Sequence, residues 1–278
     1  MTTRPPAPPA PAAPATKRSP KATIPDAIPL QLISGVMPGG DRVVAYGTGG
    51  IGKTTAAAWL PAPVFLDLQK GTKKLQVARD LVTSWPELRG KIAGFLASPP
   101  SGARTLIVDD ISSAEEFCKE HVVATRLTDK GKRVDSIDGF GWGNGWQFVY
   151  DEFVALLADL DRVADAGFNV CLIAHDVAVT KPNPSGEDFL QYQPLLYGGD
   201  KRGRANVRGL VKNWCEHLLF IGYDVFVEEG SNKGTGSGTR TIYTQELPTH
   251  LAKSRTASIT QTFTLDNPGA IWTALGIK

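Results

Sequence analysis

The chain has 278 residues, 42% of them hydrophobic, and its 30 basic and 28 acidic side chains leave a formal net charge of +2. This length suits one α/β domain with a small appendage, and the near balance of charge excludes a uniformly basic coat for nucleic acid, so any DNA contact must come from local loops. Three widely spaced cysteines without a CxxC pair favour packing roles in a reducing compartment over a disulfide framework or a zinc site.

The N-terminal segment is dominated by proline and alanine, and Met1–Lys21 contains basic but no acidic residues. Such a segment has almost nothing to bury, so we expect residues 1–27 to be a disordered leader and residues 28–278 to form the folded domain. A weak basic tether to nucleic acid is the alternative. No apolar run approaches the roughly 18 residues that span a membrane, and the N-terminus has no apolar signal core, so we expect a cytoplasmic protein without a membrane partner.

A glycine-rich loop follows the first predicted strand, Val43–Tyr46, and precedes a segment, 55–60, that is compatible with a helix. In this order, successive backbone N–H groups can hold phosphates, and glycines let the chain wrap around the anion. Lys53 would then reach the β- and γ-phosphates while the Thr54 hydroxyl ligates Mg²⁺. The pattern predicts a nucleotide-binding P-loop rather than a simple turn. Its residues are Gly47, Thr48, Gly49, Gly50, Ile51, Gly52, Lys53, Thr54 and Thr55.

Two further buried strands are predicted, over 63–68 and 105–109, and both end in polar residues. Ligands of open α/β sheets lie outside the carboxyl ends of the strands, so Asp67 and Gln69 should lie near the nucleotide, or form an ordinary polar strand end. Asp109 fits the Walker B acid that holds Mg²⁺ through its water shell. The capping-box spacing of Ser113-Ala114-Glu115-Glu116 predicts a helix from there to about Thr125.

Glycines and aromatic residues alternate over 139–146, at the end of a basic loop. Aromatic rings on a mobile segment can stack on unpaired bases, which makes Trp142 a candidate DNA contact. Alternatively, Phe140, Trp142 and Trp146 fold back onto the domain. The next stretch, 148–166, has apolar residues at helical spacing, and Gly167 ends that helix.

A fourth buried strand is predicted over 169–174, with His175 at its carboxyl end. This position favours a polar sensor of the γ-phosphate over an ordinary surface histidine. The interval 176–212 is too polar to be one element, and a long cationic loop with aromatic residues is a candidate contact for single-stranded DNA. A solvated hairpin is the alternative for part of it. The candidate DNA-binding cations in this interval are Lys201, Arg202, Arg204 and Arg208.

The C-terminal part continues the sheet with a strand over 218–223. A Gly/Ser turn over 228–238 and a partner strand over 241–244 follow. Two cations, Lys253 and Arg255, stand two residues apart, and residues 271–275 form a closing helix or turn.

With these motifs in place, the chain resembles the phage-encoded RecA-like P-loop ATPases of the AAA-domain type, the group that includes single-strand annealing recombinases. The resemblance covers about residue 33 to the C-terminus. It rests on Gly47–Thr54, Phe65–Thr72, Ile107–Asp109, Phe140–Trp146, Leu172–His175 and Ala252–Arg255. The last three segments discriminate best, because the first is shared by all P-loop proteins.

The resemblance implies an α/β, RecA-like P-loop NTPase core in which a mostly parallel central sheet is flanked by helices. It also implies a site for Mg²⁺ and ATP that a neighbouring subunit completes in a ring or filament. Lys253 and Arg255 match the Lys-x-Arg pair that can reach the adjacent protomer's γ-phosphate, with a surface strand carrying two solvated cations as the alternative. His175 resembles the family's switch residue.

One position departs from the family. Gln69 stands where relatives commonly carry a glutamate that orients the attacking water, and an amide cannot accept the proton of that water. Hydrolysis is therefore expected to be slow, or Asp67 or Asp110 takes over the role.

The expected function is ATP hydrolysis by a phage protein that acts on single-stranded DNA in recombination or replication, by annealing or strand exchange, in the host cytoplasm. A single-strand-binding protein is a further candidate partner. The rival functions are a nucleotide-gated DNA-binding or scaffold protein with little turnover, and a helicase or motor accessory of the same fold.

Overall fold

The computed structural model describes residues 29–32, 34–35, 37–227, 234–256 and 259–277. The chain divides into two units, residues 1–37 and 38–278. In the first unit, the residues that are described belong to no helix or strand. The predicted leader, residues 1–27, lies outside the described residues.

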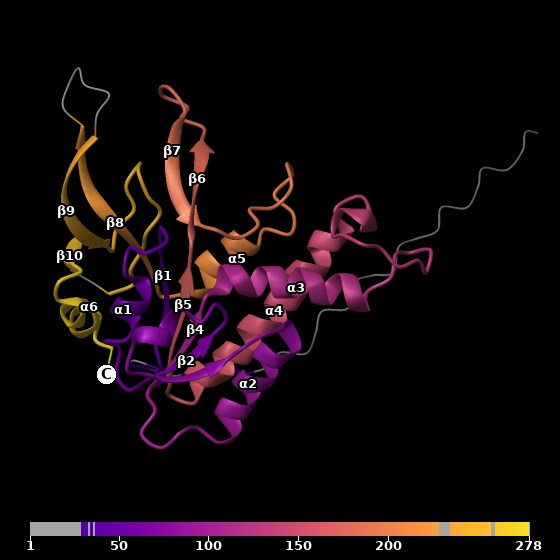
Figure 1. Cartoon of the computed structure of the whole chain (residues 1–278), viewed down its shortest axis with the longest axis horizontal. Helices are drawn as coiled ribbons and strands as arrows, with labels where there is room; N and C mark the ends of the chain where they lie inside the picture. The colour runs from indigo at the N-terminus through magenta and orange to yellow at the C-terminus, as the bar shows by residue number, and fades with distance from the viewer. Residues whose placement is uncertain (1–28, 33, 36, 228–233, 257–258, 278) are drawn as a thin grey trace, which may run out of the picture. The chain divides into compact units, whose positions relative to one another are not determined.

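An eight-stranded sheet forms the centre of the second unit (Figure 1). Its strands are β1 (Arg42–Gly47), β2 (Pro63–Asp67), β3 (Ala78–Leu81), β4 (Thr105–Asp109), β5 (Asn169–Ala174), β8 (His217–Val227), β9 (Gly234–Tyr243) and β10 (Thr262–Thr264). Their order is β10-β9-β8-β1-β5-β4-β2-β3, and all neighbours from β8 to β3 are parallel, whereas β9 and β10 pair antiparallel. The predicted α/β fold with a mostly parallel sheet is therefore confirmed.

Helices cover both faces of this sheet. They are α1 (Lys53–Ala57), α2 (Trp85–Ala97), α3 (Ile111–Thr125), α4 (Asn144–Asp165), α5 (Val207–Trp214) and α6 (Pro268–Leu275), together with the 3-10 turns η1 (Gly71–Lys74) and η2 (Asp138–Phe140). In Figure 1, α1 and α6 lie to the left of β1 and β5, and α2, α3 and α4 lie to the right. A second, two-stranded sheet pairs β6 (Asp176–Lys181) with β7 (Phe189–Pro194).

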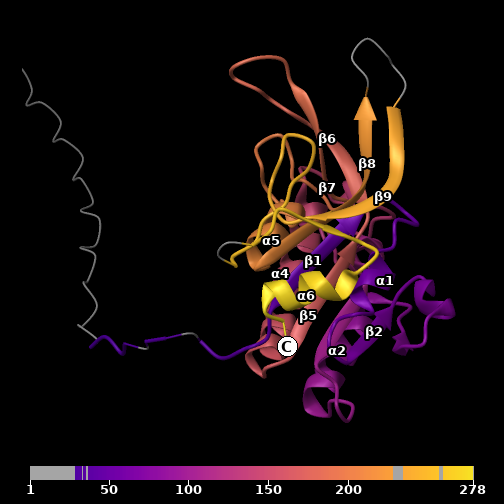
Figure 2. The ribbon, with the colours of Figure 1, turned by 90° about the vertical axis from the view of Figure 1, so that its left-hand side faces the viewer.

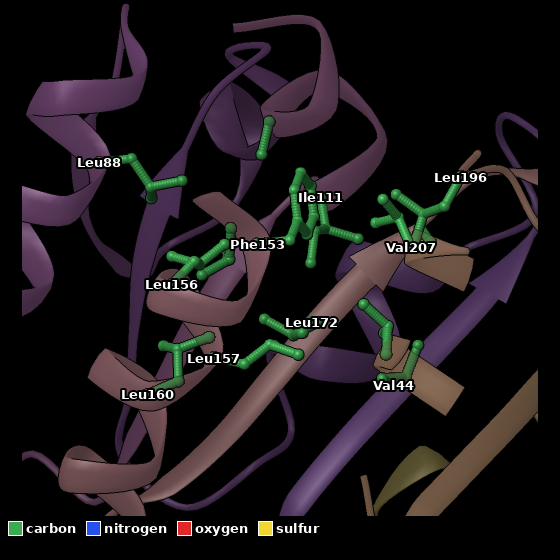
Figure 3. Close-up of a cluster of buried hydrophobic side chains, with 14 of the residues drawn as sticks. Val44, Leu88, Ile111, Phe153, Leu156, Leu157, Leu160, Leu172, Leu196 and Val207 are labelled. Carbon is green, nitrogen blue, oxygen red and sulfur yellow. The ribbon is translucent and has the colours of Figure 1, made fainter. Parts of the chain in front are cut away.

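Alternation along the strands divides the buried side chains between two cores, because successive residues of a strand point to opposite faces. Val44 and Leu172 belong to the core beneath α2 to α5 (Figure 3), while Val43 and Cys171 belong to the core beneath α1 and α6. All three cysteines are free and buried, as their predicted packing role requires. None of the helices in the described ranges is long and apolar enough to cross a membrane.

Several helices begin or end elsewhere than predicted: α4 begins at Asn144 rather than at 148, and α6 at Pro268 rather than at 271. The capping box at Ser113 does not start α3; the helix begins at Ile111, because the Asp110 side chain caps it by accepting from the Ser113 N–H at 2.7 Å. Helix α1 ends at Ala57, before the end of the predicted segment 55–60.

The loop interval 176–212 contains the hairpin β6–β7 and helix α5, so the hairpin alternative is correct for its first part. Within the expected turn, residues 228–233 lie outside the described residues and 234–238 belong to β9. Strand β3 and helix α2 were not anticipated, although Ser84, whose hydroxyl accepts from the Glu87 N–H, provided a helix-start signal.

Packing of α4 against the sheet provides a test of this core. Phe153 is fully buried in it, and its ring lies 5.2 Å from that of Trp85. Phe153→Ala should lower the free energy of unfolding by about 3–5 kcal/mol, because it removes a large side chain and leaves a cavity. Urea denaturation followed by circular dichroism measures the loss. Val154→Ala, at a 44% exposed position on the same helix, is the control and should change it by about 0.5 kcal/mol or less; equal effects of the two substitutions would contradict the assigned core.

Candidate functional site: a phosphate-binding loop at the carboxyl edge of the sheet

The glycine-rich loop connects the carboxyl end of β1 to α1. Gly47, Gly50 and Gly52 have positive φ angles of 159°, 76° and 110°. At Gly47 a Cβ atom would lie 2.1 Å from the carbonyl oxygen of Ile221, so a side chain cannot fit there. The glycines thus allow a tight path that successive N–H groups need around an anion. Because α1 is only five residues long, the loop itself must provide most of this cradle.

Lys53 lies inside the loop. Its Nζ donates to the carbonyl oxygens of Gly47 and Thr48 at 2.8 and 2.9 Å, and only 7% of the residue is exposed. Burial lowers the pKa of Lys53, although neighbouring carboxylates, Asp110 first, oppose that shift. The ammonium group is therefore held by weak neutral acceptors in the hollow of the loop, where phosphate oxygens can replace them.

The end of β4 meets the start of α1. Thr54 Oγ1 donates to Asp109 Oδ2 at 2.8 Å, and Asp109 is 7% exposed. Burial raises the pKa of Asp109 to about 6, against the hydrogen bond from Thr54. A hydroxyl and a carboxylate side by side offer the oxygen ligands that Mg²⁺ prefers. Among the described residues no group of three acidic, cysteine or histidine side chains could enclose a metal.

Asp67, at the end of β2, has a structural role. The Asp67 carboxylate accepts from the backbone N–H groups of Gln69, Gly71 and Thr72 and from the Thr72 hydroxyl, at distances of 2.5 to 3.2 Å. Burial would raise the pKa of Asp67, but the hydrogen bonds, led by that of Thr72, outweigh it and lower the pKa. Asp67 therefore holds the turn η1 and is a poor candidate for a catalytic base.

Gln69 is exposed, and its Nε2 donates to Ser113 Oγ near the start of α3. On the neighbouring strand ends, His175 Nε2 lies 3.4 Å from Asp110 Oδ2, and the His175 N–H donates to Ser112 Oγ at 3.1 Å. The parallel sheet thus places the predicted switch residue beside the Walker B strand. Its role as a γ-phosphate sensor stays a prediction.

Lys253 and Arg255 lie towards the opposite end of β8. The backbone of Lys253 pairs with Leu218 through two hydrogen bonds of 2.9 Å, and His217 is in register with Val43 near the start of β1, whereas the P-loop begins at its end. Burial lowers the pKa of Lys253. The Arg255 side chain is 59% exposed, with its Nη1 3.7 Å from Glu216. The fold does not direct this pair to the P-loop of its own chain.

The candidate DNA-binding residues come together from two distant segments. Trp142 is 95% exposed with a positive φ of 53°, and it lines a hollow of about 90 Å³ together with Arg204. Lys201 and Arg202 are exposed beside Arg204, whose guanidinium pairs with Asp200 at 2.8 Å. We call Trp142, Lys201, Arg202 and Arg204 the Trp142 patch.

The other two aromatic residues of the Gly-aromatic stretch pack inward, as the alternative interpretation expected. Phe140 is 7% exposed, and the Trp146 ring stacks on that of Tyr197 at 3.7 Å. Arg208 is also engaged inside the protein, where its guanidinium donates to the carbonyl oxygens of Pro194 and Leu196 at 2.9 and 2.7 Å. Arg208 is therefore an anchor of the loop, and its contact with DNA stays a prediction that these hydrogen bonds do not favour.

Sequence reasoning overlooked Glu115, because a glutamate in a capping box is normally exposed. Here Glu115 Oε1 accepts from the Tyr197 N–H at 2.8 Å, and the residue is 7% exposed. Burial raises the pKa of Glu115 to about 7, although the Tyr197 hydrogen bond opposes it. A buried acid thus fixes the loop of the Trp142 patch to α3.

The fold and the site define a P-loop nucleotide-binding domain of the NTPase type. The chain matches the family AAA_24, described as an AAA domain, over residues 40–256, and belongs to that family.

The chain is also similar to individual known proteins. The SPbeta prophage-derived uncharacterized protein YorG of Bacillus subtilis (strain 168) is 25% identical over 142 residues, which span 49% of this chain but only 41% of that protein. A solved structure, the KaiC-like protein PH0186 of Pyrococcus horikoshii OT3, has 13% identity and a TM-score of 0.44 over 84% of this chain and 89% of its own.

Glu115 predicts a pH dependence of stability. Its folded pKa lies above the ordinary value of 4.5, so the folded state holds the proton more tightly and stability falls as pH rises from about 4.5 to about 7. Glu115→Gln keeps an oxygen acceptor for Tyr197 but cannot ionise. The variant should gain roughly 3 kcal/mol relative to the wild type across this range, measured by urea unfolding at several pH values. Glu116→Gln, an exposed neighbour, is the control; the same gain in both variants would contradict the assignment.

Proposed function

We propose that this protein is a RecA-like phage ATPase that binds Mg²⁺ and ATP and acts on single-stranded DNA in recombination or replication. The observation that carries the nucleotide part is the meeting of Lys53, Thr54 and Asp109 at the P-loop. The prophage origin of the B. subtilis relative supports the phage assignment.

Each side chain of the site has a task that its position supports. Lys53 would exchange its two carbonyl acceptors for β- and γ-phosphate oxygens. Thr54 and Asp109 would hold Mg²⁺, which supplies positive charge to the phosphates when bound. Gln69 can orient a water through its amide but cannot take its proton, and His175 would sense the γ-phosphate beside Asp110.

The position of Lys253 and Arg255 supports assembly into a ring or filament. Phosphoryl transfer needs positive charge around the γ-phosphate, and this pair lies near the amino end of β1, away from the P-loop of its own chain. A neighbouring copy in a ring or filament would supply the pair to the adjacent site.

The Trp142 patch supports single-stranded DNA as the partner. It combines an exposed indole with three exposed cations, which is the combination of stacking surface and phosphate contacts that binds unpaired strands. Binding would recruit the protein to single strands for annealing or strand exchange, with a single-strand-binding protein as a further partner.

A second candidate function is a nucleotide-gated DNA-binding or scaffold protein with little turnover. Gln69 favours it, because the amide that faces Ser113 is no general base. ATP turnover by the purified protein, with and without single-stranded DNA, separates the two functions. Turnover stimulated by DNA supports the ATPase, whereas tight nucleotide and DNA binding without turnover supports the scaffold. Strand-annealing and unwinding assays test the further rival, a helicase accessory.

The Trp142 patch should make DNA binding sensitive to salt. Replacing Lys201, Arg202 and Arg204 together by alanine should weaken single-strand binding and reduce the salt slope by about one unit for each lost phosphate contact. Fluorescence anisotropy of a labelled oligonucleotide at several salt concentrations measures both. Arg104→Ala, an exposed arginine just before β4 at the other end of the sheet, is the control. Unchanged affinity and slope in the triple variant would move the DNA site elsewhere.

Mixing two inactive variants tests the shared site. Lys53→Ala should lose ATP binding and turnover, because phosphate charge is left uncompensated, and the double variant Lys253→Ala/Arg255→Ala should bind ATP but lose turnover. Mixed subunits should regain part of the activity, since one variant supplies the P-loop and the other the two cations. Lys73→Ala, an exposed lysine in η1, controls for loss of charge. No recovery in verified mixed assemblies would remove the proposal of a site shared between subunits.

Gln69→Glu should place a carboxylate where the attacking water is oriented. General-base catalysis contributes about 10²–10⁴-fold, so we expect at least a several-fold rise in turnover with unchanged ATP affinity. The rise should disappear when Lys253 and Arg255 are also replaced. If Gln69→Glu has no effect while Asp110→Asn abolishes turnover, the base belongs to β4 instead.

A further inference from the structure

A cavity lies between the two hairpins at the carboxyl edge of the sheet, apart from the Trp142 patch. Its volume is about 520 Å³. Figures 1 and 2 show the hairpin β6–β7 beside the ends of β8 and β9. The P-loop residue Thr48 and Asp176, which follows the switch residue, form part of its wall. The cavity therefore borders the nucleotide site.

Aromatic rings form most of the remaining wall. The Tyr192 ring lies parallel to that of Phe220, with 10° between the planes and 5.6 Å between the centroids, and Phe220 stacks on His250 at 4.8 Å. Tyr192 and Tyr223 are 46% and 49% exposed. Large apolar rings that remain half exposed beside a cavity provide faces on which a planar ligand can stack.

The polar groups of the wall indicate what kind of ligand fits. Asp176 is an acid, and no lysine or arginine is among the described lining residues, so a phosphate group would be repelled. His250 is 2% exposed; its Nδ1 is 3.0 Å from Thr249 Oγ1, while its Nε2 has no hydrogen-bond partner among the described residues. Hydrogen-bonding groups on an uncharged, planar ring would suit this wall.

We propose that this cavity binds an unpaired nucleobase of single-stranded DNA, an inference that rests on the DNA-binding function proposed above. The base would stack on Tyr192 and Tyr223, while its sugar and phosphate stay outside, away from Asp176. Tyr192 and Tyr197 are five residues apart, so the cavity and the stack beside the Trp142 patch are at most about 18 Å apart along the chain. A few nucleotides span that distance. One strand can therefore contact the cations of the patch and place a base next to the P-loop.

The test uses the full chain and an oligonucleotide that contains one 2-aminopurine, whose fluorescence is quenched by stacking. The wild type should quench it. The double variant Tyr192→Leu/Tyr223→Leu keeps the backbone contacts and apolar bulk but removes the stacking faces. It should lose roughly 5-fold to 150-fold in single-strand affinity for each stacked base, together with the quenching. Its salt slope should stay that of the wild type, because no phosphate contact is lost.

Leu190→Ala, an exposed residue of β7 outside the cavity wall, is the matched control and should bind like the wild type. Normal affinity and quenching in a folded Tyr192→Leu/Tyr223→Leu protein would overturn the inference. It would leave the proposed function intact if the triple variant of the Trp142 patch still weakens binding. A wild type that binds no single-stranded DNA would remove the function and the inference together.

Three other results would reassign the cavity and so overturn the inference. A reduced salt slope in the tyrosine variant would indicate phosphate contacts. Weaker ADP binding with normal DNA affinity would assign the cavity to the base of the bound nucleotide. Loss of self-assembly with normal DNA affinity would assign it to a cationic side chain of a second copy. If the double variant does not fold, the 2-aminopurine fluorescence with the wild type decides. Bound wild-type protein that does not quench this fluorescence would exclude stacking on the base and overturn the inference.

Discussion

The parallel pairing of β1, β5, β4 and β2 is the constraint on which the rest of the site depends. It fixes the register so that Tyr46 lies opposite Ala174 and Asp67 opposite Asp109. Four strands therefore end at the same edge of the sheet. The strand pairing alone brings the residues that follow them close together. The hydrogen bond from Thr54 to Asp109 is the consequence, because it joins the start of α1 to the end of β4 across the intervening strand β5.

This constraint also explains how much could be predicted from the sequence. Short apolar runs that end in polar residues indicate buried parallel strands, and ligands bind at their carboxyl ends. The placement of the P-loop, Asp109 and His175 at this edge could therefore be predicted, whereas their functional roles stay predictions. Helix starts were harder. Asp110 and Ser113 both suit an N-cap, and only the path of the chain out of β4 decides that Asp110 takes that position. Strand β3 is exposed along all four residues, so it lacks the apolar pattern that reveals the others.

Side chains brought together by loops were the least predictable. Trp142 and Arg204 are distant in sequence and share one hollow, and nothing in either segment specifies the other. Glu115 lies in a sequence that is typical of an exposed helix, yet the loop at Tyr197 covers it. In both cases the deciding factor is the course of the chain after β7. That course depends on the internal hydrogen bonds of Arg208, a residue whose charge alone suggested a contact with DNA.

The hydrogen bonds of the nearby carboxylates explain why none of them readily replaces the base that is missing at Gln69. Asp67 is held by four hydrogen bonds in the turn η1, Asp110 caps α3, and Asp109 accepts from Thr54. Each of these three acids already has a partner that stabilises the fold, so one that replaced Gln69 as base would have to give up part of that role. This competition supports our expectation that any hydrolysis would be slow.

The segment that follows β7 connects the two surfaces that we assign to DNA. The Leu195 N–H donates to the His175 carbonyl oxygen at 2.8 Å, and the Tyr197 N–H donates to Glu115. Upstream, in β7 itself, Tyr192 forms part of the wall of the aromatic cavity, and downstream Arg204 belongs to the Trp142 patch. A shift of His175 on γ-phosphate binding would therefore act on both surfaces through one short stretch of backbone. We infer that nucleotide state and strand binding are coupled through this stretch, because it contacts both His175 and Glu115.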